Sequence, residues 1–235
     1  MEHKVGCMVC GAELIYSSVD KPLACFYCGT MRATNAACIK GHFVCDTCHS
    51  ETANGIIERY CASTTSLSPL SSAMVLMKHP AVKMHGPEHH FLVPAVLLSA
   101  FYNKVQPGLQ EEKETKIQEA RKRAENVKGG FCGFYGACGA GVGTGIFISL
   151  VTNATPLSKA EWSLSNRMTS ESLRVIAENG GPRCCKRCSF LAIKKAVEFA
   201  RKELKVELSV EQSTVCDFSN FNKECLKNEC LFYKA

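Results

Sequence analysis

The chain has 235 residues, 46% of them hydrophobic and 21% charged, which excludes a disordered protein and allows a buried core. No apolar run reaches the ~18 residues of a membrane span, and the first residues lack the apolar region of a signal peptide. The formal net charge of +6 equals the excess in residues 183–205, where eight lysines and arginines face two glutamates. We interpret this segment mainly as a solvated helix face, with an anionic ligand, an acidic partner or a nucleic acid as alternatives.

The sixteen cysteines are the most informative residues of the composition. Nine of them occur in CxxC or CC pairs, in a chain that is long enough to fold without disulfides. This usage favours metal or redox chemistry in a reducing compartment, so we expect a cytoplasmic protein.

The first fifty residues contain eight side chains with the spacing of metal ligands. Two thiolates separated by two residues commonly bind one tetrahedral ion, so eight ligands predict two zinc ions. The predicted ligands are Cys7, Cys10, Cys25, Cys28, Cys38, His42, Cys45 and Cys48.

Two pairings of these ligands are open. In a tandem scheme, the first four cysteines form a zinc ribbon and the last four ligands bind the second ion. In a cross-braced scheme, the second CxxC pair shares its ion with Cys45 and Cys48, which predicts a treble clef with a hairpin over residues 29–44 and a helix to about Tyr60. The spacing has the outline of a RING finger that lacks its last pair downstream. We favour the cross-brace, because the sequence supports a helix after Cys48.

The rest of the chain indicates a mainly α-helical protein. We expect a di-zinc β/α module at residues 1–62, a Ser/Thr/Pro-rich linker at 63–78 and a helical domain with a Gly/Cys-rich segment at 79–235. Ser189 has the position of a helix cap. Helices are predicted over residues 88–103, 109–127, 158–178 and 189–205, with a further apolar segment at 144–152.

The Gly/Cys-rich segment holds eight glycines within residues 129–145, beside Cys132 and Cys138. Such a density of glycine lets backbone N–H groups converge on a cofactor, or lets another segment approach closely. Three interpretations are open: thiol or metal chemistry beside a cofactor, close helix packing, and a phosphate-binding loop. In the first, the glycines at the cofactor would be Gly139, Gly141 and Gly143.

A further cluster, Cys184, Cys185 and Cys188, lies among cationic residues at the start of a predicted helix. A helix N-terminus and nearby cations both favour the thiolate. We predict that Cys132, Cys138, Cys184 and Cys185, together with Cys188, meet in one pocket as catalytic thiolates or as ligands of a [4Fe–4S] cluster.

The end of the chain offers three more ligands, Cys216, Cys225 and Cys230. A third metal site there would need a fourth ligand from elsewhere. The histidines between residues 79 and 90 are candidates for a further ligand or proton donor.

These patterns predict a metal-binding protein that uses an iron–sulfur cluster or reactive thiolates for redox or sulfur-linked chemistry, beside a structural zinc module. Two alternatives are open. One is a non-catalytic zinc-folded module that binds a protein or a nucleic acid, and the other is a zinc–thiolate site for alkyl or methyl transfer.

The chain resembles a family of uncharacterised cysteine-rich proteins from anaerobic prokaryotes. The motifs that carry the resemblance are CxxCG…CxxCG…GHFVCDTCH, HHFLVPAVLLSAFYNK, GGFCGFYGACGAGVGTGIF, GGPRCCKRCSFLAI and the closing Cys-x8-Cys-x4-Cys, which together span nearly the whole chain. The resemblance implies an anaerobic, metal-rich setting. Some members look to be joined to S-adenosylmethionine-dependent methyltransferase or radical enzyme domains, so it also implies such an enzyme as a protein partner.

Overall fold

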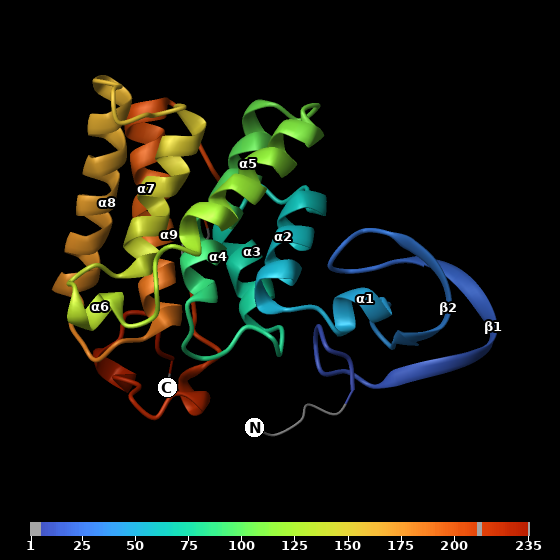
Figure 1. Ribbon diagram of the computed structural model, residues 1–235. Helices are drawn as coiled ribbons and strands as arrows, with labels where there is room; N and C mark the ends of the chain where they lie inside the picture. The colour runs from blue at the N-terminus through green and yellow to red at the C-terminus, as the bar shows by residue number, and fades with distance from the viewer. Residues whose placement is uncertain (1–5, 211–212, 235) are drawn as a thin grey trace.

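The computed structural model describes residues 6–210 and 213–234, and the protein is mainly helical, as expected. Within these residues, one sheet of two antiparallel strands, β1 (Leu14–Ala24) and β2 (Met31–Cys38), projects to one side of the helices (Figure 1). Ala24 lies opposite Met31, so the turn that carries Cys25 and Cys28 forms the tip of the hairpin. The hairpin predicted over residues 29–44 is therefore wrong in position. In the structure, the first strand of the hairpin comes before the turn that carries Cys25 and Cys28, not after it.

The helices follow the hairpin in chain order. They are α1 (Asp46–His49), α2 (Ala53–Ser63), α3 (Pro69–Met77), α4 (Glu88–Val105), α5 (Gln110–Ala124), α6 (Phe131–Phe134), α7 (Gly139–Val151), α8 (Ala160–Glu178) and α9 (Cys185–Phe199), with a π-helical turn η1 (Ala200–Leu204) and two 3-10 turns, η2 (Ser219–Phe221) and η3 (Lys227–Glu229). The predicted helices at 88–103, 109–127 and 158–178 are confirmed within a few residues.

The start of α9 differs from its prediction. The helix begins at Cys185 instead of Ser189, because the side chain of Cys184 caps it by accepting the backbone N–H of Arg187. The hydroxyl of Ser189 is buried inside the helix and has no hydrogen-bond partner among the described residues. All three cysteines of this cluster therefore lie on the first turns of a helix or at its cap.

The predicted linker is also partly helical. Residues 69–77 form α3, in which Pro69 occupies the first turn and the hydroxyl of Ser68 accepts the backbone N–H of Ser71 at 3.1 Å. Leu70, Leu76 and Met77 are buried. The Ser and Pro residues that suggested a linker thus act as the start of a helix.

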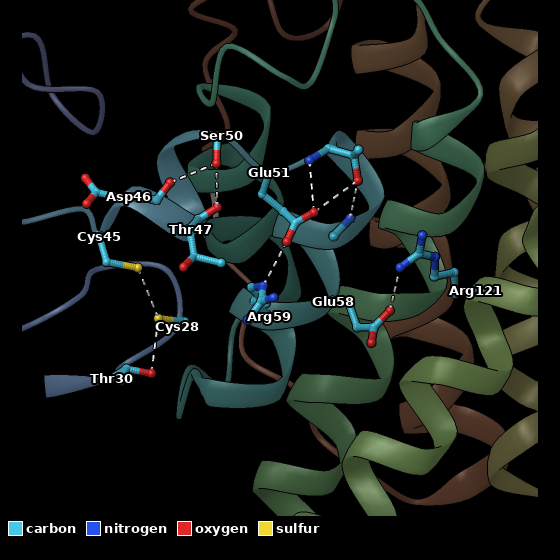
Figure 2. A network of polar contacts seen from close by, with 12 residues as sticks. Cys28, Thr30, Cys45, Asp46, Thr47, Ser50, Glu51, Glu58, Arg59 and Arg121 are labelled. Atoms are coloured by element: carbon cyan, nitrogen blue, oxygen red, sulfur yellow. Dashed lines mark hydrogen bonds and ion pairs between the residues drawn. The ribbon is translucent and has the colours of Figure 1, made fainter. Parts of the chain in front are cut away.

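Helix α2, which we assigned to the metal module, packs against α4 and α5. An ion pair of 2.9 Å between Glu58 and Arg121 joins α2 to α5 (Figure 2). One continuous apolar core runs from Tyr27 in the metal module to Phe232 near the end of the chain, and the ring of Tyr27 packs edge-on against His79 at 4.8 Å. None of the described helices combines the length and the apolar character that crossing a bilayer requires.

The glycine-rich segment forms most of α7, which packs closely between α4 and α8. A Cβ atom at Gly143 would lie 2.8 Å from Cδ of Pro94 and 3.0 Å from the carbonyl oxygen of His90, both on α4. At Gly141, a Cβ would lie 2.7 Å from Leu173 on α8. The interpretation of these glycines as sites of close helix packing is confirmed, and the phosphate-binding loop is wrong because the residues are helical.

This packing predicts a stability effect at Gly143. We expect Gly143→Val to lower the free energy of unfolding by about 1–3 kcal/mol, because the new side chain would overlap Pro94 and the backbone of α4. Denaturant unfolding measures the change. Gly133→Val is the matched control, since a Cβ there meets no atom within 4 Å. An equal effect of the two substitutions would contradict the proposed packing.

Candidate metal centres and a cysteine pocket

The hairpin tip and α1 form the first candidate metal centre. The sulfurs of Cys25, Cys28, Cys45 and Cys48 all lie within 4.8 Å of one another. The sulfurs of Cys28 and Cys45 are 3.9 Å apart (Figure 2), close to the ~3.8 Å expected between two thiolates on one tetrahedral zinc ion. The backbone N–H of Cys45 donates to the sulfur of Cys25 at 3.4 Å. The left-handed Gly29, with φ of +68°, closes the turn of the first pair.

The second candidate centre lies at the other end of the hairpin. Cys7, Cys10, Cys38 and His42 present ligand atoms within 4.8 Å of one another. Nδ1 of His42 lies 3.3 Å from the sulfur of Cys10 and 3.5 Å from that of Cys38. This grouping is the cross-braced scheme, so the tandem scheme is wrong.

The ionisation of the thiols reflects their crowding. Burial raises the pKa of Cys48 and of Cys45. For Cys28, the hydrogen bonds with Thr30 and with the neighbouring thiols outweigh burial and lower the pKa to about 7. Four thiolates this close together would repel one another, so they cannot all form without a counter-charge. A bound divalent cation supplies that charge and stabilises all four. Four sulfurs in one centre, and three sulfurs with one imidazole nitrogen in the other, are the donor sets of structural zinc.

The five cysteines predicted to converge do line one cavity. It has a volume of about 440 Å³ and is bordered by α4, α7, α8 and α9 and by the α6 segment. Gly139 lines it, whereas Gly141 and Gly143, which we placed beside a cofactor, face neighbouring helices. The cysteines at its wall are Cys132, Cys138, Cys184, Cys185 and Cys188.

Cys138 and Cys188 are neighbours in this pocket. Cys138 precedes the first turn of α7, and Cys188 lies on α9. The nearby thiol of Cys188 and the backbone N–H groups of Ala140 and Gly141 outweigh burial and lower the pKa of Cys138 to about 6. The proximity of Cys138 and burial raise the pKa of Cys188. The pair therefore holds one thiolate and one thiol at neutral pH.

Two histidines of α4 complete the wall, and sequence reasoning did not assign them to it. Nδ1 of His90 lies 2.7 Å from the carbonyl oxygen of Val127, and Nδ1 of His89 lies 3.1 Å from that of Gly86. Because a carbonyl oxygen only accepts, both Nδ1 atoms carry a proton. Nε2 of His89 is buried with no partner among the described residues, and burial lowers the pKa of this ring far below its usual range.

The C-terminal cysteines lie at a different, smaller cavity. Cys216, Cys225 and Cys230 line it together with Cys184, which therefore borders both cavities. The sequence did not identify Cys184 as the fourth cysteine of this cavity. Because Cys184 lies 32 residues before the nearest tail cysteine, no short spacing pattern links them.

The cationic segment 183–205 is only partly a solvated face. Lys186 is 1% exposed and Arg187 is 5% exposed. Nζ of Lys186 donates to the carbonyl oxygen of Lys83 at 2.9 Å, and the guanidinium of Arg187 donates to those of Gly180 and Pro182 at 2.7 and 2.8 Å. The solvated-face interpretation is wrong for these two residues, because they extend into the protein at the start of α9.

The metal centres predict a selective loss of zinc. His42→Ala should lower the zinc content from about two ions per chain to about one, because it removes a ligand of a closed four-ligand site. Metal analysis of the purified protein measures the ratio. His49→Ala is the control, since His49 follows a ligand but belongs to neither group. Equal zinc contents in the two variants would contradict the assignment.

Comparisons with known proteins place the helical part of the chain in a family. Neither the curated proteins nor the solved structures contain a significant match. Residues 57–233 match the model of one protein family, and this stretch includes the cysteine pocket and the C-terminal cysteines but not the two hairpin centres. The match spans well over half of the chain, so the protein belongs to the family of unknown function DUF5714.

Proposed function

We propose that this protein carries out thiol-based redox or sulfur-linked chemistry at Cys138, with Cys188 as the second thiol of the reaction. The observation that carries the proposal is that both residues line one pocket, in which the nearby Cys188 and the start of α7 lower the pKa of Cys138. In this proposal the two hairpin centres bind zinc and have a structural role, because four protein ligands leave no open coordination position.

The pair has the parts that thiol–disulfide exchange requires. The Cys138 thiolate attacks one sulfur of a disulfide substrate, forming a mixed disulfide and releasing the other sulfur as a thiolate. Cys188 then loses its proton and attacks the sulfur of Cys138, which releases the second substrate thiolate and leaves a Cys138–Cys188 disulfide. Both released thiolates take up protons. The substrate thereby gains two electrons, and an external thiol reductant restores the dithiol.

The surroundings of the pair support this chemistry. His89 and His90 line the same pocket, and Nε2 of His89, which has no partner among the described residues, can accept the proton of a thiol. Leu173, Ile176 and Ala177 provide an apolar side for the substrate.

The binding-module alternative is less well supported. It relies on the cationic segment, of which Lys186 and Arg187 are buried. The methyltransferase or radical-enzyme partner, the anaerobic setting and the cytoplasmic location stay predictions from the sequence.

The proposal predicts the reactivity of Cys138 towards iodoacetamide. Because its pKa is lowered to about 6, the thiolate forms as the pH rises through 6, and the rate of alkylation should reach its plateau near pH 7. For an ordinary thiol with a pKa of ~8.5, the rate of alkylation would still increase well above pH 7. Mass spectrometry of timed digests measures the rate at each cysteine separately.

Two variants test the cause of this reactivity. Cys188→Ala removes the neighbouring thiol that lowers the pKa of Cys138, so the midpoint for Cys138 should rise by roughly one pH unit. Cys132→Ser, a change at an exposed cysteine of the same pocket, should leave the midpoint in place. A midpoint near that of an ordinary thiol in the unsubstituted protein, or no shift with Cys188→Ala, would exclude the proposed pair.

A further inference from the structure

The C-terminal tail has little regular structure, yet it encloses a cavity against the start of α9. Its only helices in the described part, 206–210 and 213–234, are the short turns η2 and η3 (Figure 1). Four cysteines line this cavity, together with the rings of Phe190, Phe218 and Phe232. Such a loop-rich segment with few core residues is commonly held by a metal centre.

Backbone N–H groups point at the sulfurs of this cavity. The N–H of Phe218 donates to Cys216 at 3.4 Å, and that of Lys227 donates to Cys225 at 3.4 Å. The N–H of Arg187 donates to Cys184 at 3.5 Å. The same kind of contact occurs in the hairpin centres, where Cys25 and Cys38 accept backbone N–H groups at 3.4 and 3.3 Å. Hydrogen bonds of this kind stabilise metal-bound thiolates.

Two buried cations lie beside the same cavity. Arg187 lines it, and Nζ of Lys186 lies 4.9 Å from the ring centre of Phe218, which also lines it. Among the described residues, neither cation has a carboxylate oxygen within 4.0 Å. Glu88 lies near Lys186 and partly offsets the lowering of its pKa by burial. A buried charge without a counter-charge is costly, so Arg187 in particular indicates a neighbouring anion. A centre with four thiolate ligands carries net negative charge and would supply it.

The spacing of the sulfurs distinguishes a cluster from a single ion. Within residues 6–210 and 213–234, the groups of three or more ligand atoms that lie within 4.8 Å of one another are the two hairpin centres. The four cysteines of the tail cavity line a common space, but no three of their sulfurs lie within 4.8 Å of one another. A cubane cluster needs such spacing, because each of its cysteines binds a different iron atom.

From the cavity, the N–H contacts, the buried cations and this spacing, we propose that Cys184, Cys216, Cys225 and Cys230 bind a [4Fe–4S] cluster. This site is separate from the Cys138–Cys188 pair and does not depend on the proposed function. Cys184 borders both cavities, so the cluster would lie next to the thiol pocket.

Anaerobic purification of the full chain tests the proposal. We expect about four iron atoms and four acid-labile sulfides per chain in addition to zinc, with the visible absorbance of a cluster. Cys216→Ser and Cys230→Ser should lose the iron and sulfide but keep the zinc. Cys138→Ser and Cys132→Ser are the matched controls and should keep the cluster, whereas Cys138→Ser alone should abolish the thiol chemistry.

A measurement on the unsubstituted protein covers the case in which these variants fail to fold. The four cysteines should resist alkylation in the cluster-loaded protein and become reactive after iron chelation. A third zinc ion in place of iron would overturn the proposal. So would the absence of any metal beyond the two zinc ions, or a cluster that is lost with Cys138→Ser and kept with Cys216→Ser.

Discussion

The close approach of α7 to α4 and α8 is the constraint on which the proposed chemistry depends. Larger residues at Gly141, Gly143 or Gly145 would push α7 away from its neighbours. With glycine there, the start of α7 lies where Cys138 meets Cys188 of α9. The glycines therefore act on the thiol pair indirectly: they determine the position of the helix whose N-terminal N–H groups stabilise the thiolate.

The two ends of the chain differ from its middle in what stabilises them. Residues 53–205 bury apolar side chains between helices, whereas the hairpin and the tail have few core residues and many cysteines. In both ends, backbone N–H groups donate to sulfurs. Metal binding would supply the folding free energy that a small apolar core cannot. In this account the helices position the thiol pocket, and the metal centres hold the two ends against them.

Much of the fold could be predicted from the sequence, and the reasons for the misses are physical. The eight hairpin ligands and helices α4, α5 and α8 follow from local spacing and periodicity, which the sequence displays directly. Helix α3 was missed because Ser and Pro serve both linkers and helix starts. The start of α9 was missed because a cysteine, an uncommon cap, takes the place of Ser189. The pairings of Cys138 with Cys188 and of Cys184 with the tail depend on tertiary packing, so the sequence predicted a convergence of cysteines but not which of them meet.

The central claim is that Cys138 and Cys188 form one reactive pair, and mapping of disulfide bonds tests it most directly. The folded, metal-loaded protein would be treated with a mild oxidant and digested, and its crosslinked peptides identified by mass spectrometry. The account predicts a disulfide between Cys138 and Cys188 as the first to form, because the two residues are neighbours in one pocket and the pKa of Cys138 is lowered. Pairing of Cys138 with Cys132 or Cys185, or oxidation that leaves Cys138 unpaired, would contradict it.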